Sequence, residues 1–203
     1  MGYIHICVGP MQMNAYVYFE EISKKAAVID PGDDGDLILA KVKEKGLDVS
    51  YILLTHGHFD HTGAVEHIRK ATGAALLAHN DENQMLLSPQ ISFSNSGSLK
   101  ADEFIKDGDD ISIGNCKLKV VHTPGHSAGS CCFYSEDEGI LFSGDTLFRE
   151  SVGRYDLPTG NGKTLMASIE SKLFTLPDNT AVYPGHMGST TIGHEKAANP
   201  FMR

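Results

Sequence analysis

Four residues that can bind a metal ion lie within six positions of the sequence, in the segment T-H-G-H-F-D-H at residues 55–61. Imidazole and carboxylate groups are ligands that suit zinc and similar borderline cations. On an extended backbone, side chains two residues apart point the same way, so His56 and His58 can bind one ion together. Asp60 and His61 follow where the chain turns, and we expect them to point toward a second ion. A metal site explains this segment better than a polar loop with chance histidines, because the pattern follows an apolar strand and serves no packing purpose.

The composition describes a folded, acidic chain. Of its 203 residues 41% are hydrophobic and 21% are charged, which provides a sizeable core, argues against intrinsic disorder and predicts a single domain over residues 1–203. The formal net charge of −9 disfavours a nucleic-acid partner, because binding to a phosphate backbone needs clustered Lys and Arg. A small anionic substrate remains compatible, since bound divalent ions would reverse the local charge.

The first residues and the cysteines give no sign of secretion or of a membrane. The chain does not begin with a basic region followed by a long apolar one, so no signal peptide is expected. No apolar run approaches the ~18–20 residues that span a bilayer. The 4 cysteines form no C-x-x-C pair and are predicted to be reduced and buried. We therefore expect a cytoplasmic protein without a membrane partner, and the sequence sets no oligomeric state.

Strand-like and helix-like segments alternate along the chain. Runs rich in β-branched, aromatic and other apolar residues predict strands at residues 3–8, 14–19, 25–29, 51–54, 75–78, 111–113, 117–121, 130–134, 140–143 and 180–183. Apolar residues at helical spacing predict helices over residues 36–45, 62–72, 162–173 and 193–198. Two β/α halves of similar size favour an α/β fold with four layers, an αββα sandwich. Residues 86–103 show no clear period and are predicted to be either a mobile lid or a surface connection.

Further candidate ligands follow predicted strands, each in a turn. T-P-G-H ends at His126, S-G-D-T contains Asp145, and P-G-H ends at His186. Strand ends that deliver side chains to one edge of a sheet are how α/β proteins build sites. A glycine directly before each of these residues lets the backbone turn sharply. An I-D-P-G segment places Asp30 at the end of another predicted strand. The histidines in or beside other strands are expected to be structural: His5, His79 and His122.

In their order and spacing these segments resemble the metallo-β-lactamase superfamily of metallohydrolases, over residues 30–186. The resemblance implies a metallo-β-lactamase-like αββα sandwich with two metal ions at one edge. The implied ligands are His56, His58 and His126 for the first ion, Asp60, His61 and His186 for the second, and Asp145 as a bridge between them. Asp30 is similar to the aspartate of that family that orients the ligands from behind.

Such a site predicts a binuclear metallohydrolase. A water shared by two ions ~3.5–4 Å apart ionises near neutral pH and becomes a metal-bridging hydroxide that attacks a carbonyl. Asp60 is the candidate catalytic residue, because its carboxylate can accept a proton from that water as well as bind metal. The sequence has no G-x-S-x-G segment, so no serine nucleophile is expected. Zinc is the expected metal, and iron or manganese also tolerate His/Asp sites.

Within the superfamily, the segment G-D-T-L-F with the following G-R, and the ending T-T-I-G-H-E-K, resemble the glyoxalase II group (hydroxyacylglutathione hydrolases), in its short single-domain branch. This resemblance implies a small-molecule thioester substrate, whose thiolate leaves with little proton help. Arg154 aligns with a basic position that contacts glutathione. Asp156 stands where that group has a tyrosine, and Met187 and Gly188 replace a glutamate and a tyrosine. The carrier thiol is therefore left open.

Other activities of the same fold were compared with these residues. The commonest true β-lactamases carry cysteine at the position of Asp145 and arginine at that of His61, so β-lactam hydrolysis is not expected. Persulfide dioxygenases share H-x-H-x-D-H and a G-R-x-D segment, present here at residues 153–156. They use a single iron held by the residues that match His56, His126 and Asp145. A mononuclear iron persulfide dioxygenase is therefore the alternative prediction.

Overall fold

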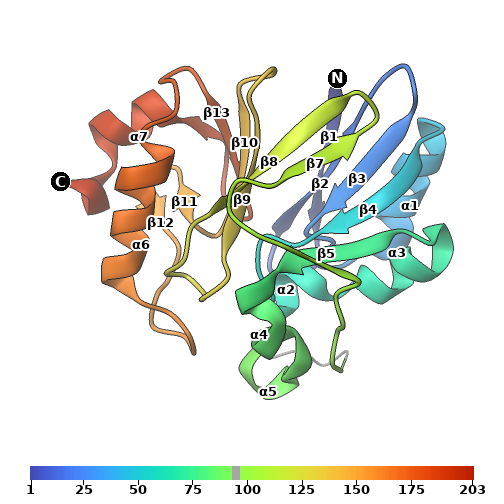
Figure 1. Cartoon of the computed structure of the whole chain (residues 1–203), viewed down its shortest axis with the longest axis horizontal. Coiled ribbons are helices and arrows are strands. Elements are labelled where there is room, and N and C mark those ends of the chain that lie inside the picture. The colour runs from blue at the N-terminus through green and yellow to red at the C-terminus, as the bar shows by residue number, and fades with distance from the viewer. Residues whose placement is uncertain (93–96) are drawn as a thin grey trace.

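Two six-stranded sheets pack face to face, and helices cover the outer face of each (Figure 1). The computed structural model describes residues 1–92 and 97–203. In spatial order, the first sheet contains β1 (Gly2–Val8), β2 (Met13–Phe19), β3 (Lys25–Ile29), β4 (Asp48–Leu53), β5 (Ala75–His79) and β6 (Glu103–Ile105). The second contains β14 (Thr190–Thr191), β13 (Ala181–Pro184), β10 (Ile140–Gly144), β9 (Cys131–Ser135), β8 (Cys116–His122) and β7 (Asp110–Ile113). The predicted four-layer αββα sandwich is confirmed.

The first sheet changes from antiparallel to parallel at β3. Strands β1, β2 and β3 pair antiparallel, whereas β3, β4, β5 and β6 pair parallel. Parallel neighbours need a crossover, which a helix usually supplies. Helix α1 (Gly35–Glu44) supplies the crossover between β3 and β4, and α2 (Phe59–Thr62) with α3 (Val65–Thr72) supplies the next one. The β-α-β-α-β alternation of the sequence therefore predicts this half of the fold correctly.

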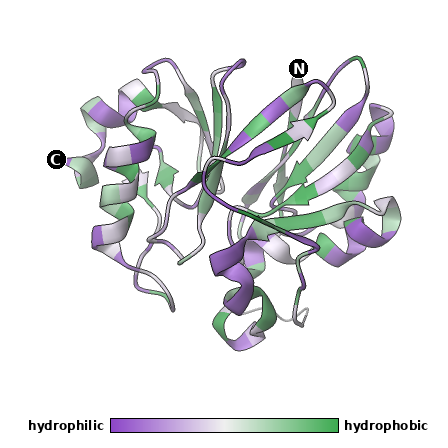
Figure 2. Cartoon of the chain, in the orientation of Figure 1, coloured by the Kyte–Doolittle hydropathy of each residue, from purple (hydrophilic) through white to green (hydrophobic). Residues whose placement is uncertain are grey.

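Three apolar clusters hold the four layers together. Between the first sheet and its helices, Ile38 of α1 and Ile68 of α3 are fully buried. Between the two sheets, Phe133 and Phe142 pack against Leu53. The third cluster joins the second sheet to α6 (Gly162–Ser168), the π-helical turn η2 (Ile169–Leu173) and α7 (Ile192–Ala198). Figure 2 shows the same division, with hydrophobic strands inside and mixed hydropathy along the outer helices.

Some predicted elements differ from the observed ones in extent. The helix predicted over residues 62–72 is divided at residues 63–64 into α2 and α3. The helix over 162–173 changes from α6 to the π-helical turn η2 at Ile169. The remaining short elements were not predicted; they are η1 (Asn80–Glu82), α4 (Asn83–Leu87), α5 (Pro89–Ser92), β6, β11 (Leu147–Phe148), β12 (Ser151–Val152), β14 and η3 (Pro200–Met202).

The segment predicted to be a lid or a connection, residues 86–103, is described only in part. Its first residues complete α4 and form α5, and its last residue begins β6. Leu99 and Ala101 are buried in the cluster between the first sheet and its helices, so this end of the segment is packed. Residues 93–96 lie outside the described residues, and the lid remains a prediction.

The prediction of buried cysteines is correct for half of them. Cys131 and Cys132 on β9 are buried and free. Cys7 is exposed and Cys116 is partly exposed, because β1 and β8 each present alternate residues to solvent. Over the described residues, no helix combines the length and the apolar character that a membrane span requires.

Candidate metal centre

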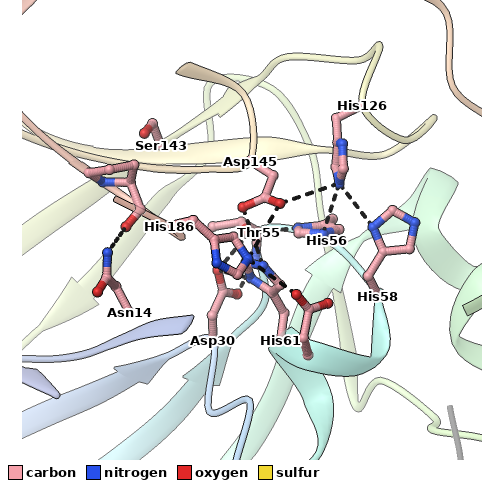
Figure 3. A network of polar contacts seen from close by, with 12 residues as sticks. Asn14, Asp30, Thr55, His56, His58, His61, His126, Ser143, Asp145 and His186 are labelled. Atoms are coloured by element: carbon pink, nitrogen blue, oxygen red, sulfur yellow. Dashed lines mark hydrogen bonds and ion pairs between the residues drawn. The ribbon is translucent and has the colours of Figure 1, made fainter. Parts of the chain in front are cut away.

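Five strands end at the same edge of the sandwich, and a predicted site residue follows each of them (Figure 3). Asp30 follows β3, the segment 55–61 follows β4, His126 follows β8, Asp145 follows β10, and His186 follows β13. The turn before His186 is fixed by Asn14 of β2, whose side-chain amide donates to the carbonyl of Pro184 at 3.0 Å. The topology therefore brings all the predicted ligands together, although 130 positions separate His56 from His186.

The chain changes direction inside the H-x-H-x-D-H segment, as predicted. His58 has extended backbone angles, and α2 begins at the next residue. His56 and His58 precede this change, whereas Asp60 and His61 lie within the helix. The segment consequently contributes to two groups of side chains.

His56, His58 and His126 form the first group. Nε2 of His126 lies 2.9 Å from Nδ1 of His58 and 3.1 Å from Nε2 of His56. Zn–N bonds of about 2.0–2.1 Å at tetrahedral angles would place the ligand nitrogens roughly 3.3 Å apart. The three rings are buried and nearly perpendicular to one another, so their nitrogens face a common point.

Asp60, His61 and His186 form the second group. Oδ2 of Asp60 lies 3.1 Å from Nε2 of His186, and ligand atoms of all three residues lie within 4.8 Å of one another. His61 is completely buried, whereas Asp60 and His186 are partly exposed. The second group therefore lies on the solvent side of the site.

Asp145 lies between the two groups. Its Oδ1 is 3.3 Å from Nε2 of His61, and its Oδ2 is 3.8 Å from Nε2 of both His126 and His186. One carboxylate thus faces nitrogens of both groups, which is the position that a bridging ligand would need. Gly185 leaves room for it, because a Cβ there would lie 2.4 Å from Oδ1 of Asp145.

Buried partners fix the orientation of these rings from behind. Asp30 accepts hydrogen bonds from Nδ1 of His61 at 2.9 Å, from the Thr55 hydroxyl at 2.6 Å and from the Thr55 backbone N–H at 2.7 Å. Nδ1 of His126 donates to the carbonyl of Arg154 at 2.7 Å. The Thr55 hydroxyl also lies 3.1 Å from Nδ1 of His56. A partner on one ring nitrogen sets the tautomer and leaves the other nitrogen free to bind a cation.

Burial keeps the first group neutral. It lowers the pKa of His58 to about 3 and, together with the charge of His61, holds the pKa of His56 well below its usual value. Burial also lowers the pKa of His126. Neutral imidazole is the form that binds a metal ion.

Neighbouring histidines favour the ionised form of the Asp60 and Asp145 carboxylates. Burial raises the pKa of Asp145, but the charge of His61 outweighs it and holds that pKa well below the usual value. Burial lowers the pKa of His61, yet Asp145 and Asp30 outweigh it and hold this pKa well above the usual value. The two carboxylates therefore favour the protonated form of His61, and a cation bound at Nε2 would compete with that proton.

The residues present fit divalent metal ions. Nε2 of His61 and Oδ1 of Asp145 are buried 3.3 Å apart, and within the described chain neither atom makes a hydrogen bond of good geometry. Buried polar atoms without partners are costly and uncommon in native proteins. Two orphaned ligand atoms facing one another across a His/Asp cluster indicate a site arranged for a cation.

One buried carboxylate of this region was not predicted. Glu82, at the end of η1, accepts hydrogen bonds from the backbone N–H groups of Gly57 and Gly129 and from the Ser127 hydroxyl. These residues flank the first group, at positions 57 and 127–129 of the chain. The N-D-E segment carries no periodic signal, so the sequence alone offered no means of finding it.

A cavity of about 430 Å³ opens over the site. Asp60, Asp145 and His186 lie in its wall, together with apolar side chains at its rim. The exposed apolar members of that rim are Met11, Phe59 and Met187. Arg154 also lines the cavity, and its guanidinium makes two bonds to the Asp156 carboxylate, at 2.9 and 3.0 Å.

A further His/Asp group lies at the ends of β5 and β8. His79 and His122 stack with ring centroids 3.9 Å apart and planes at 12°, next to Asp81. His79 accepts from the Asp81 N–H, and His122 donates to the carbonyl of Ala128. Parallel rings do not aim their in-plane lone pairs at one point, so we keep these histidines as structural.

Comparisons with known proteins agree with this architecture. The family model described as the metallo-beta-lactamase superfamily matches residues 8–186. The chain is 39% identical to the probable metallo-hydrolase YqgX of Bacillus subtilis (strain 168), over 96% of this chain and 94% of that protein. It is 32% identical to the hydroxyacylglutathione hydrolase GloC of Haemophilus influenzae, over 97% and 96% of the two chains.

Two solved structures are also similar. One, described as the BLEG-1 B3 metallo-beta-lactamase, has a TM-score of 0.93 and 39% identity and is matched over 99% of both chains. The other is TTHA1623 in a di-iron-bound form, with a TM-score of 0.84 and 37% identity over 98% of this chain and 99% of that one. The chain belongs to the metallo-beta-lactamase superfamily.

Proposed function

We propose that this chain is a binuclear metallohydrolase that cleaves small-molecule thioesters, with chemistry of the glyoxalase II type. The observation that carries the proposal is the convergence of seven His and Asp side chains in two groups that share Asp145. The similarity to the hydroxyacylglutathione hydrolase GloC supports a thioester as the substrate class.

In this proposal the first group would hold one ion, the second group another, and Asp145 both. When bound, two divalent ions polarise the carbonyl under attack and lower the pKa of a water between them. Zinc suits this donor set. Iron is the chief alternative, and the similarity to a structure in a di-iron-bound form supports it.

Asp60 is the proposed proton acceptor. Its carboxylate lines the cavity and bonds Nε2 of His186. Burial raises the pKa of Asp60, but His186 and His61 outweigh it and lower that pKa. An ionised carboxylate at the cavity wall can accept the proton of the attacking water while the new C–O bond forms. The C–S bond then breaks, and the thiol leaves as a thiolate that needs no general acid.

The cavity rim would bind the substrate mainly through apolar contact. Met11, Phe59 and Met187 are exposed around the opening, and covering them is worth roughly 25 cal/mol per Å² of apolar surface removed from water. Arg154 is the proposed contact for an anionic group of the substrate. Asp156 already bonds this guanidinium, so a substrate carboxylate would have to compete with Asp156 for Arg154.

The test combines metal content with thiol release. The purified chain would be assayed with S-lactoylglutathione and with S-lactoyl-N-acetylcysteamine, which has no carboxylate, and with a chromogenic cephalosporin for comparison. We expect close to two ions per chain and release of thiol, both lost in His58→Ala. A chain that holds two ions and releases thiol from neither thioester would refute the proposal, and faster cephalosporin cleavage would assign a β-lactamase activity instead.

A mononuclear iron persulfide dioxygenase is the second candidate. The proximity of His56 and Asp145 to His126 favours it, because two histidines and one carboxylate are the facial set that holds non-haem iron. Elemental analysis with an oxygen electrode separates the two functions. One iron per chain and oxygen uptake with glutathione persulfide would replace the hydrolase with the dioxygenase.

A further inference from the structure

We propose that Glu82 is a positioning residue of the metal centre, whose single buried carboxylate ties together the two loops that carry the first group. Its role rests on the proposed metal centre and does not depend on which substrate is cleaved. Glu82 is 1% exposed and, within the described residues, makes no hydrogen bond to a predicted ligand, so it would act through the backbone that carries them.

Each carboxylate oxygen of Glu82 holds a different loop. Oε2 accepts the backbone N–H of Gly57 at 3.0 Å, and Gly57 lies between His56 and His58. Oε1 accepts the N–H of Gly129 at 2.8 Å and the hydroxyl of Ser127, which directly follows His126. Each residue of the first group is therefore next in sequence to a residue that donates a hydrogen bond to Glu82.

The two loops also pack directly on the segment that carries Glu82. A Cβ at Gly57 would lie 3.2 Å from Oε2 of Glu82, and a Cβ at Gly129 would lie 2.5 Å from its backbone nitrogen. A Cβ at Gly129 would clash with the backbone of the segment that carries Glu82, and a Cβ at Gly57 would make tight contacts with Oε2 of Glu82 and with the side chain of Leu86. The spacing between the loops is thus set by one side chain, since Oε1 and Oε2 are held rigidly on the same carbon.

A carboxylate suits this place better than an amide. All three partners donate, and a glutamine would turn one of its two ends into a donor that faces another donor. Loss of an outer partner that orients the ligands also commonly lowers metal affinity. Glu82 would therefore influence both the geometry and the affinity of the first group for an ion.

The experiment loads the intact chain with Co²⁺ and compares Glu82→Gln with Glu66→Gln, which changes an exposed carboxylate on α3. The absorption spectrum of bound cobalt reports ligand geometry, and competition with a chelator gives the affinity of each of the two ions. We expect Glu82→Gln to fold and to alter the cobalt spectrum. Its affinity for one of the two ions should fall about 10–100-fold, as the loss of an outer partner commonly causes. The Glu66→Gln control should match the unmodified chain in all three respects.

Each outcome decides the role of Glu82. A folded Glu82→Gln with an unchanged spectrum and unchanged affinities would overturn it. If Glu82→Gln does not fold, Ser127→Ala is the second variant, because it removes one donor and leaves the carboxylate. A smaller change of the cobalt spectrum and a smaller loss of metal affinity in Ser127→Ala would support the role. An unchanged spectrum would overturn it. An unmodified chain that binds no cobalt would instead overturn the proposed metal centre itself.

Discussion

Replacing Asp30 by asparagine should weaken metal binding by the second group, although Asp30 is not itself a predicted ligand. Asp30 is 2% exposed, and its backbone adopts a positive φ of 48°, which aspartate and asparagine both tolerate better than most residues. The substitution is nearly isosteric, so it changes hydrogen bonding and charge while the backbone is retained.

The size of the effect follows from three donors. The Thr55 N–H points at Oδ1 of Asp30, and the Thr55 hydroxyl and Nδ1 of His61 point at Oδ2. An asparagine has one oxygen, so its amide nitrogen must face at least one of these donors. A buried donor without a partner costs about 1–3 kcal/mol. If His61 turns to avoid the amide, its Nε2 leaves the position beside Asp145, and loss of such a partner typically reduces metal affinity about 10–100-fold.

The assay is a titration of Asp30→Asn with Zn²⁺ against a chromophoric chelator, followed by thermal unfolding of the metal-free chain. Asp36→Asn is the matched control, since Asp36 is exposed on α1 and bonds only His67 within the described residues. We expect a lower affinity for one of the two Zn²⁺ ions. The free energy of unfolding of the metal-free chain should fall by about 1–3 kcal/mol, the cost of one unsatisfied donor. Two ions bound as tightly as in the unmodified chain would refute the role assigned to Asp30.

Three further predictions concern the proposed activity. If Asp60 accepts a proton, Asp60→Asn should keep most of the bound metal and lose about 100-fold or more in kcat. Metal content is measured alongside the rate, and loss of metal would show that Asp60 is a ligand only. Removing metal with a chelator should abolish thiol release and lower Tm by about 5–10 °C, because an ion at 100 times its Kd contributes ~2.7 kcal/mol; an unchanged Tm would contradict binding in the folded core. Asp156→Asn should free Arg154 and raise kcat/KM for S-lactoylglutathione relative to S-lactoyl-N-acetylcysteamine about 2–5-fold, the scale of an exposed ion pair; a constant ratio would remove Arg154 as an anion contact.

The predicted ligands could be found from the sequence because their signals are local. H-x-H-x-D-H follows a buried strand, and His126, Asp145 and His186 each follow a glycine at a strand end. The alternation of strands with helices also implied parallel pairing, which in turn places those strand ends at one edge. The layered α/β fold thus follows from periodicity and turn residues, whereas the division of the ligands into two groups bridged by Asp145 is implied by the resemblance to the metallo-β-lactamase superfamily.

Glu82 lay beyond such reasoning because its contacts cross 25 and 47 positions of the chain and go to backbone groups. Nothing in a sequence marks a glycine N–H as the partner of a distant carboxylate. Strands β11, β12 and β14 contain two residues each, too few to show a period. Likewise, the break between α2 and α3 at residues 63–64 coincides with a tertiary contact, the hydrogen bond from the Ala64 N–H to the carbonyl of Pro31 at 2.9 Å.

Charge balance connects the buried carboxylates with the proposed pair of ions. Asp30, Glu82, Asp60 and Asp145 lie in or directly behind the site, and each is buried or mostly covered. Despite burial, neighbouring histidines hold the pKa of Asp60 and that of Asp145 below the usual value, so these two carboxylates carry negative charge in a region of low dielectric, where uncompensated charge is expensive. Burial shifts the pKa of Glu82 the other way and raises it. Burial lowers the pKa of His56 and His58, whereas at His61 and His186 the acidic neighbours outweigh burial and raise the pKa. Two divalent cations would compensate this negative charge in both groups, because Asp60 lies in the second group and Asp145 faces nitrogens of both. For that reason the donor set suits two dications better than one.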